Sequence, residues 1–221
     1  MTYDFAVVLG YWEALLQGLE VTVKLTLLCA ALGSALGFVT SLARVSPVRV
    51  LRWASTVYVE FFRGTPVLIQ LFWFFFCLPI VLGTDISNFT AATVTLTLYT
   101  GAITSETFRA SLKSIRREEI DACIALGLPR ITQIIYIVLP QALLRAVPTL
   151  LSNFVSLFKE SALVSAVGMA DLMFIGQNIS SNIAKPVEVL TVVAVIYFVV
   201  AFPLTRAVTV IERKMLAKLA I

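Results

Sequence analysis

Long apolar runs separated by short polar segments dominate this chain. A helix needs about 20 apolar residues to cross a bilayer core, and suitable runs lie at 19–43, 66–83, 89–107, 141–178 and 187–211. The fourth run is longer than one crossing needs, so we expect an interrupted span there. Lipid-facing backbone must satisfy its own hydrogen bonds, and the runs show no barrel-like alternation. The pattern predicts an all-α, polytopic bundle of about five spans.

The composition favours a membrane protein over a soluble one. Of the 221 residues, 59% are hydrophobic and 14% are charged, and the mean hydropathy is +0.95. A soluble domain carries more charge than this. Without a low-complexity linker or an internal repeat, residues 1–221 are expected to form one domain with its core at 18–212. The first residues lack a basic segment and a cleavage site, so we expect no cleaved signal peptide.

The net charge of +4 could indicate nucleic-acid binding, but the placement of the basic residues indicates a membrane. Basic side chains gather after the first and third runs and at the C-terminal end: Arg44, Arg49, Arg52, Arg63, Arg109, Lys113, Arg116, Arg117, Arg130, Arg206, Arg213, Lys214 and Lys218. By the positive-inside rule, the N-terminus lies outside, and the C-terminus and residues 108–140 lie in the cytoplasm. Five crossings satisfy this topology. We therefore expect a lipid bilayer, and no nucleic acid, as a partner.

The connection at 108–140 contains a polar helix–turn–helix pattern. Residues 118–126 have a helix-forming composition, and Gly127 suits the left-handed position just after a helix. Pro129 suits the first turn of a second helix, which runs toward Pro140. We therefore expect two helices joined by a sharp turn.

The first helix of this connection presents one acidic and several small side chains, Asp121, Ala122, Cys123 and Ala125. A helix with such a surface fits closely into a groove on a partner. The same composition also fits an ordinary polar connection between two spans, so the residues alone leave both interpretations open.

This connection resembles the Glu-Ala-Ala loop of the membrane subunits of ABC importers. Asp121 stands at the Glu position, one methylene shorter, and Cys123 stands at the second Ala, with Gly127 following. Further stretches resemble the polar amino-acid branch of that family: Tyr58 to Pro66, Gly101 to Arg109, Leu139 to Ala142 with Pro148, and Lys159 to Leu163. Ser161-Ala162 stands where Thr-Ser is common. The resemblance covers roughly residues 18–212.

The resemblance implies the type I ABC importer permease fold and a division of labour. Two permease subunits, identical or related, form the path, while two cytoplasmic ABC ATPases bind ATP and Mg²⁺ and a solute-binding protein delivers the solute from outside. Coupling to the ATPase then falls to Asp121, Ala122, Cys123, Gly127, Pro129 and Arg130. The chain has no Gly-rich phosphate loop ending in Lys-Ser or Lys-Thr, so we expect it to bind no cofactor.

The implied activity is import by alternating access across the inner membrane of a bacterium. The implied solutes are polar amino acids or related compounds such as opines. The implied route for force is the 118–140 loop, which the ATPases would move. A passive polar-solute channel, or a membrane scaffold without ATP coupling, is the alternative.

A polar stripe marks the fourth run. Its members recur at steps of 4, 3, 4 and 3, which places them on one helical face: Arg145, Thr149, Ser152, Ser156 and Lys159, flanked by Asn153 and Glu160. A charge at the bilayer centre costs about 2.5–3.5 kcal/mol, so this face should meet protein or water. One interpretation is a route for a zwitterionic or charged solute. The other is an interhelical seam in which Lys159 and Glu160 neutralise each other.

Other small and polar residues favour packing over chemistry. The third run carries Thr93, Thr97, Thr100, Thr104 and Thr107 on one face beside Gly101, and the first carries Gly33, Gly37 and Ser41 at four-residue spacing. Threonine hydroxyls can bond to the preceding turn, and small residues let helices approach closely. The three cysteines, Cys29, Cys77 and Cys123, have no metal-ligand spacing and are expected to be packing residues.

A break is expected just before the second run. A continuous helix over 53–82 would be about 45 Å long, and a bilayer core is about 30 Å thick, so Gly64 and Pro66 should interrupt it. We expect residues 53–63 to form an elbow helix that lies at the cytoplasmic interface, with aromatic residues as anchors. Glu60 and Arg63, at i,i+3, either pair with each other or contact a moving element during gating. Gly64, Pro66 and Pro140 are assigned gating or structural roles.

Enzymatic chemistry has little support in the residues. The chain has no histidine, which excludes His-based acid–base catalysis and His-containing metal sites. A Ser156–Lys159 dyad is conceivable because both lie on one face. The adjacent Glu160 would keep Lys159 protonated, the wrong state for a base. We expect a permease subunit without a metal or catalytic site.

Overall fold

The computed structural model describes residues 4–219, and every regular element in that range is helical. The elements are α1 (Ala6–Leu9), α2 (Trp12–Val45), α3 (Arg49–Gly64), α4 (Val67–Phe72), the π-helical turn η1 (Trp73–Cys77), α5 (Leu78–Leu82), α6 (Asn88–Lys113), α7 (Arg117–Ala125), α8 (Arg130–Gln133), the π-helical turn η2 (Ile134–Val138), α9 (Leu139–Glu160), the 3₁₀ segment η3 (Ser161–Val167), α10 (Leu172–Ile183) and α11 (Pro186–Leu219). The predicted all-α class is confirmed.

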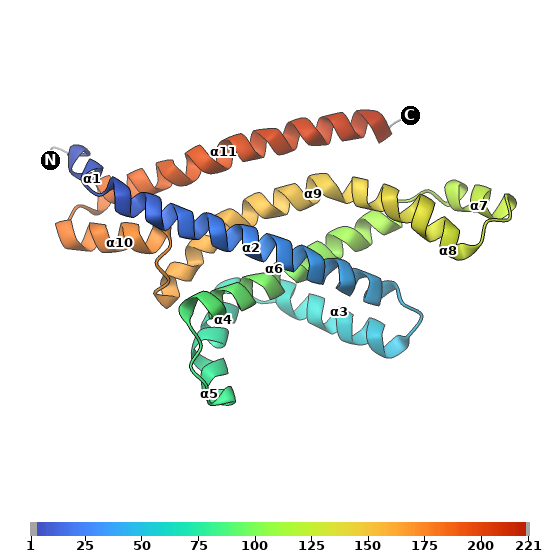
Figure 1. Cartoon of the computed structure of the whole chain (residues 1–221), viewed down its shortest axis with the longest axis horizontal. Helices are drawn as coiled ribbons and strands as arrows, with labels where there is room; N and C mark the ends of the chain where they lie inside the picture. Colours follow the sequence, from blue (N-terminus) through green and yellow to red (C-terminus); the bar gives the residue numbers. More distant parts are fainter. Residues whose placement is uncertain (1–3, 220–221) are drawn as a thin grey trace.

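Four long helices run roughly along the long axis of the molecule (Figure 1). α2 and α6 share the most extensive contact, α9 packs on α6, and α11 packs on α9 and α10. α1 and α10 lie at one end of the bundle, whereas α7, α8 and the C-terminal end of α11 lie at the other (Figure 1). The loop predicted to meet a partner and the C-terminus therefore share one end, opposite the N-terminal helix.

Among residues 4–219, three helical stretches are long and apolar enough to cross a membrane, namely Trp12–Val45, Arg130–Val167 and Pro186–Met215. The bent pair Arg49–Gly64 and Val67–Leu82 raises the count to up to four if it forms one span. α6 covers the run predicted at 89–107, but its many threonines lower its hydropathy. Helices occupy all the predicted runs, while the number of crossings and the orientation stay predictions.

α2 and α6 approach each other through glycine. A Cβ atom added to Gly37 would clash with Thr104 Oγ1 and lie 2.8 Å from the Gly101 carbonyl oxygen. A Cβ on Gly33 would lie 2.7 Å from Thr100 Cβ. The Thr104 hydroxyl also donates to the Gly33 carbonyl oxygen at 3.0 Å. The close packing predicted from the small residues of the first run is confirmed.

The predicted break before the second run is present. α3 ends at Gly64, and the chain turns by 106° before α4 begins after Pro66. The Gln70 amide closes the turn by donating to the Phe62 carbonyl oxygen at 2.9 Å and to the Thr65 hydroxyl at 2.7 Å. A buried side-chain amide therefore holds the bend in place.

α3 contains residues 53–63, for which we predicted an elbow helix, and its position relative to the membrane stays a prediction. It runs back beside the C-terminal half of α2 and packs on α6 (Figure 1). Ser55, Val59 and Phe62 form its buried face, and Tyr58 donates from its hydroxyl to the Leu98 carbonyl oxygen of α6 at 2.6 Å. The aromatic residues that we interpreted as interfacial anchors include side chains that pack this helix on its neighbours.

Each π-helical turn lies just before a proline. η1 ends two residues before Pro79, and η2 ends two residues before Pro140. Proline has no N–H to donate and crowds the preceding turn, and a wider π turn provides the space. Pro140 therefore marks a local widening of a continuous helix rather than its end.

The long fourth run is interrupted, as predicted. α9 gives way to η3, and Gly168 then adopts a left-handed φ of +71° before α10. Asp171 caps α10 by accepting from the Phe174 backbone N–H at 2.9 Å. Leu172 donates its backbone N–H to the Thr22 hydroxyl at 3.1 Å, which ties this corner to α2.

The cysteine prediction is partly confirmed. Cys29 and Cys123 are buried, whereas Cys77 is exposed on η1. Cys77 is therefore not a packing residue within this chain.

Candidate functional site

The helix–turn–helix predicted in the 108–140 connection is present. α7 ends with Gly127 in a left-handed conformation, φ +70°. Gly127 donates its N–H to the Ile124 carbonyl oxygen at 2.9 Å, and Leu128 donates to that of Cys123 at 3.1 Å. These two bonds make a Schellman motif, which satisfies the last carbonyls of α7. Pro129 precedes α8 rather than occupying its first turn.

The second helix of the loop does not end at Pro140. α8 passes through η2 directly into α9, and Arg130–Val167 forms one helical stretch. The buried Gln133 donates its side-chain amide to the Leu128 carbonyl oxygen at 2.7 Å, which holds the turn against this helix. The loop is therefore joined without a flexible linker to the helix that carries the polar stripe.

Large apolar side chains are exposed on α7, on the turn after it and on α8. The exposed fractions are 61% for Ile124, 76% for Leu126 and 72% for Ile131. Asp121 and Ala122 are exposed beside them, and Cys123 packs inward. Exposed apolar side chains gathered at one end of a molecule mark an interaction surface. The sequence interpretation selected the acidic and small residues of α7 and missed these three large ones.

The polar stripe of α9 lies along a groove shared with α11. Ser152, Ser156 and Lys159 form one wall of a groove of about 220 Å³. The facing wall comes from α11 and includes Thr205, Thr209 and Glu212, which we did not select from the sequence. Their steps of 4 and 3 resemble those of the α9 stripe and could have identified them. Two helices, not one, supply the polar surface.

The groove continues toward the end that carries α7. A second cavity of about 370 Å³ is lined by Arg145 and Thr149 of α9, by Arg116, and by Glu212, which borders both spaces. Basic and acidic groups thus alternate along the groove, from Lys159 through Glu212 to the two arginines. A surface with both signs of charge suits a zwitterion better than a simple ion.

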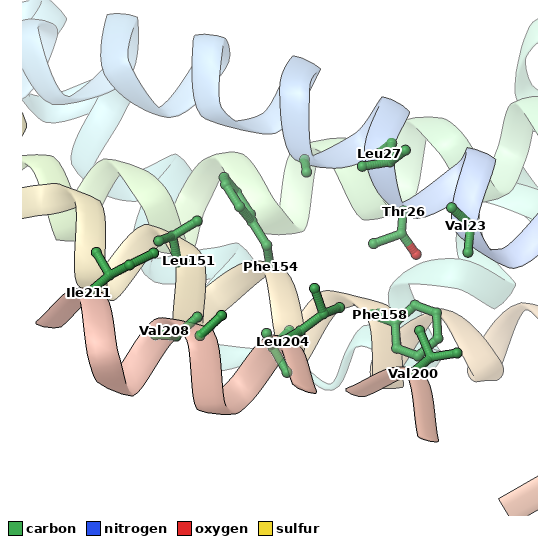
Figure 2. Close-up of a pocket in the computed structure, with 13 residues that line it drawn as sticks. Val23, Thr26, Leu27, Leu151, Phe154, Phe158, Val200, Leu204, Val208 and Ile211 are labelled. Carbon is green, nitrogen blue, oxygen red and sulfur yellow. The ribbon is translucent and has the colours of Figure 1, made fainter. Parts of the chain in front are cut away.

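A neighbouring face of α9 is apolar, and Val155 borders both this face and the polar groove. A groove of about 400 Å³ lies between α2, α9 and α11, and Figure 2 shows its lining residues, among them Phe154 and Phe158 of α9. Its only polar lining residue is Thr26. α9 therefore carries its polar stripe on one face and apolar side chains on the next.

The two residues that flank the stripe contact α6. Asn153 donates its side-chain amide to the Thr107 hydroxyl at 3.1 Å, and the Tyr99 hydroxyl donates to Glu160 at 3.3 Å. Within residues 4–219, no direct ion pair joins Lys159 to Glu160. Both interpretations of the run therefore hold, each for different residues. The stripe lines a groove, whereas Asn153 and Glu160 form a hydrogen-bonded seam with α6.

Arg145 does more than line the groove. Its guanidinium donates to the Ser114 carbonyl oxygen at 2.6 Å, at the C-terminal end of α6. It also lies 3.6 Å from a carboxylate oxygen of Glu119 in α7 and 3.4 Å from the Gln141 side-chain oxygen. One side chain of α9 therefore contacts both α6 and α7.

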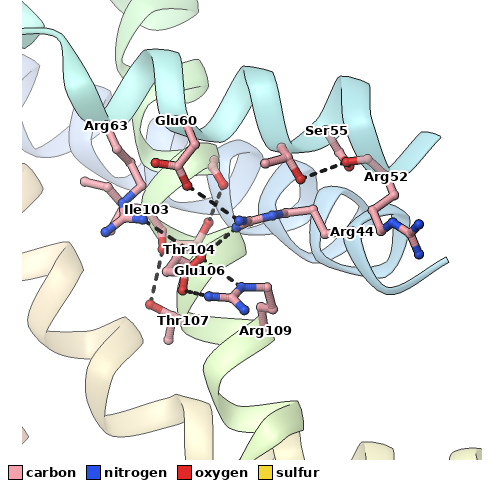
Figure 3. Close-up of polar contacts among 12 residues, drawn as sticks. Arg44, Arg52, Ser55, Glu60, Arg63, Ile103, Thr104, Glu106, Thr107 and Arg109 are labelled. Carbon is pink, nitrogen blue, oxygen red and sulfur yellow. Dashed lines mark hydrogen bonds and ion pairs between the residues drawn. The ribbon is translucent and has the colours of Figure 1, made fainter. Parts of the chain in front are cut away.

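A charged cluster joins α2, α3 and α6 (Figure 3). Glu106 accepts from Arg44 at 2.6 Å, forms a hydrogen-bonded ion pair with Arg109, and lies 3.9 Å from Arg63. The bond to Glu106 raises the pKa of the Arg109 guanidinium. Glu60 lies 3.7 Å from Arg44. The predicted Glu60–Arg63 pair is therefore wrong, because each residue pairs with another helix instead.

Comparison with known proteins identifies the family to which this chain belongs. The family model described as "Binding-protein-dependent transport system inner membrane component" matches residues 32–217. The chain belongs to this family. It is a permease subunit of the inner membrane, as its motifs implied, and its fold is that of ABC importer permeases.

Two curated relatives of this permease come from Bacillus subtilis (strain 168). The arginine transport system permease protein ArtQ is 34% identical over 215 residues, covering 97% of this chain and 98% of the relative. The L-cystine transport system permease protein TcyB is 34% identical over 207 residues, covering 93% and 88%.

Solved structures agree with these relatives. The structure described as an amino acid ABC transporter with histidines matches with a TM-score of 0.93 at 30% identity, covering 97% of this chain and 100% of the other. An inward-facing MetNI methionine ABC transporter matches with a TM-score of 0.78 at 23% identity, covering 93% and 98%. The second match supports the fold.

Proposed function

We propose that this permease imports a polar amino acid through the groove between α9 and α11, driven by separate cytoplasmic ATPases that bind α7. The observation that carries the proposal is the continuity of the two sites. The exposed surface of α7 leads through α8 and η2 into the same helix that lines the polar groove. A partner that moves α7 therefore acts directly on α9.

The surface of α7 supports a docked protein. Ile124, Leu126 and Ile131 expose apolar area beside the acidic Asp121. A short helix presented in this way fits a groove on a partner, with the apolar side chains as anchors. We assign ATP and Mg²⁺ to that partner, a pair of ABC ATPases. This assignment leaves no catalytic role to the chain itself.

The chemistry of the groove supports a zwitterionic solute. Lys159 can attract a carboxylate, Glu212 can attract an ammonium group, and the hydroxyls of Ser156 and Thr209 lie between them along the groove. The relatives' names supply the substrate class, since they transport arginine and cystine. A second permease subunit would close the open side of the groove, and a solute-binding protein would deliver the amino acid from outside.

The test is uptake into proteoliposomes that contain the permease with its co-purified ATPase and solute-binding protein. A panel of labelled arginine, cystine, glutamine, glutamate and leucine is offered, with ATP or a non-hydrolysable analogue inside. We expect uptake of a polar member that requires hydrolysis. Leu126→Asp should abolish this uptake, because it places a charge in the docked surface, while Leu126→Met should preserve it.

Uptake that proceeds equally with the analogue, and that Leu126→Asp leaves intact, would contradict the proposal. The chain would then act as a passive channel. Uptake of leucine alone would instead contradict the assignment of a polar substrate.

A further inference from the structure

We infer that Arg145 is a positioning residue that transmits the movement of α7 to the polar groove through its ion pair with Glu119. This inference rests on the proposed function and adds to it the contact through which force passes. It also reassigns Arg145, which the sequence pattern placed simply among the residues of the path. The pair joins the docking helix to the helix that lines the groove.

The first step of the argument is that α7 is held loosely. Cys123 is the only buried residue of α7 in the described structure. α7 is otherwise attached by the chain on either side, by its Schellman turn at Gly127 and by the Glu119–Arg145 pair. A helix with so little buried surface takes its position from its few specific contacts.

The second step is that both the backbone and the guanidinium of Arg145 are held in place. Its backbone lies inside α9, four residues before Thr149 of the groove. Its guanidinium donates to the Ser114 carbonyl oxygen at 2.6 Å, where α6 ends, and reaches Glu119 at 3.6 Å. Arginine can bond several acceptors at once because its donors form a rigid fork. One guanidinium therefore joins three helices.

The third step concerns exposure. The side chains of Arg145 and Glu119 are 22% and 32% exposed. Water screens a fully exposed pair strongly, and such pairs contribute little. This pair is mostly shielded, so a displacement of Glu119 pulls on the guanidinium and through it on α9 and α6. Because Arg145 also bonds to Ser114, α9 and α6 are expected to move together.

The chain offers a matched control on the same helix. Glu118 and Glu119 are both acidic residues of the first turn of α7. Each therefore loses the same favourable interaction with the N-terminal end of the helix dipole when it is changed to glutamine. Only Glu119 has Arg145 as a partner. Any difference between Glu118→Gln and Glu119→Gln isolates the pair.

The first measurement follows hydrogen–deuterium exchange of residues 117–126 in the solubilised permease. We expect Glu119→Gln and Arg145→Gln to accelerate exchange in α7, whereas Glu118→Gln should leave the wild-type rate. The double variant Glu119→Gln with Arg145→Gln should be no faster than Arg145→Gln alone, since both changes remove one interaction. Equal exchange in Glu118→Gln and Glu119→Gln would overturn the inference whatever the protein transports.

The second measurement is the number of amino-acid molecules imported per ATP hydrolysed by the reconstituted complex. Glu119→Gln should lower this ratio at least about fivefold, the lower end of typical coupling between sites, with hydrolysis by the ATPases retained. Glu118→Gln should match the wild type. A merely structural role would reduce uptake and hydrolysis together.

The outcomes separate the two proposals. If the wild-type complex shows no ATP-dependent uptake, the proposed function fails and this inference fails with it. If the wild type transports and α7 loosens in Glu119→Gln but the ratio is unchanged, the pair positions α7 without transmitting its movement, and only this inference is overturned.

Discussion

Replacing Gly37 with alanine should destabilise the bundle, because this glycine sets the distance between α2 and α6. The added Cβ would clash with Thr104 Oγ1 and lie 2.8 Å from both the Gly101 carbonyl oxygen and the Ser105 backbone nitrogen. Backbone atoms of a packed helix cannot move aside as a flexible side chain does. The two helices must separate or shift along each other.

The magnitude follows from three terms. Overpacking a close interface costs about 1–3 kcal/mol, and disturbing the Thr104 hydrogen bond to Gly33 costs about 0.6 kcal/mol in a membrane bundle. Alanine recovers about 1 kcal/mol of helix propensity relative to glycine. A net loss of about 0.6–2.6 kcal/mol remains. For a chain of this size, a loss of 2 kcal/mol lowers the melting temperature by about 4–8 °C.

The assay is thermal unfolding of the solubilised permease, followed by a thiol-reactive fluorophore. Cys29 and Cys123 are buried and become reactive on unfolding, while the exposed Cys77 is changed to serine in every variant. The matched control is Gly64→Ala, whose Cβ would meet no atom within 4 Å. A Gly37→Ala variant that melts at or above the wild-type temperature, or a Gly64→Ala variant that falls as far, would refute the packing argument.

Three further predictions use the same melting assay or exchange in the loop. Glu106→Gln should lower the free energy of unfolding by about 2 kcal/mol, because it leaves three arginines without their shared carboxylate. The control Glu60→Gln, at a mostly exposed site, should change the melting temperature little. Asn153→Leu and Thr107→Val should each cost about 0.6 kcal/mol, and a double-mutant cycle should show that the two losses are not additive. Gly127→Ala should loosen α7 in hydrogen exchange, because a left-handed residue with a Cβ is strained by about 1–2 kcal/mol although nothing lies within 4 Å of it. An unchanged melting temperature in Glu106→Gln, additive losses in the Asn153–Thr107 cycle, or unchanged exchange in Gly127→Ala would each contradict the corresponding argument.

The hydrophobic pattern predicted the helices well because the bilayer imposes one requirement along the whole chain. An apolar run long enough to cross must be helical. The turn at Gly127 and the bend at Pro66 were equally predictable. Glycine allows a left-handed backbone, and proline fixes its own φ and donates no hydrogen bond. Local chemistry in both cases decides local structure.

Pairing between distant segments was not predictable in the same way. Glu60 and Arg63 satisfy a helical pairing rule, yet both contact other helices, because Arg44 and Glu106 approach only after α2, α3 and α6 pack. Arg145 shows the same limit. Periodicity places it on the polar face of α9, but only tertiary structure brings Ser114 and Glu119 to its guanidinium.

Thr205, Thr209 and Glu212 were missed for a different reason. Their spacing was visible in the sequence, but the last apolar run was interpreted only as a span. A polar stripe in one helix requires a polar surface opposite it, since neither can face lipid at low cost. Searching the other spans for a matching stripe would have found the second wall of the groove.

The central claim is that α7 drives alternating access of the groove between α9 and α11. The most direct test places a single cysteine at Ser156, with Cys29, Cys77 and Cys123 replaced, in the reconstituted complex. Its reactivity toward a membrane-impermeant thiol reagent is then measured from each side, with and without trapped ATP. We expect the reactive side to switch on ATP trapping, and the switch to disappear in Leu126→Asp. Reactivity from both sides that is indifferent to ATP would contradict the account.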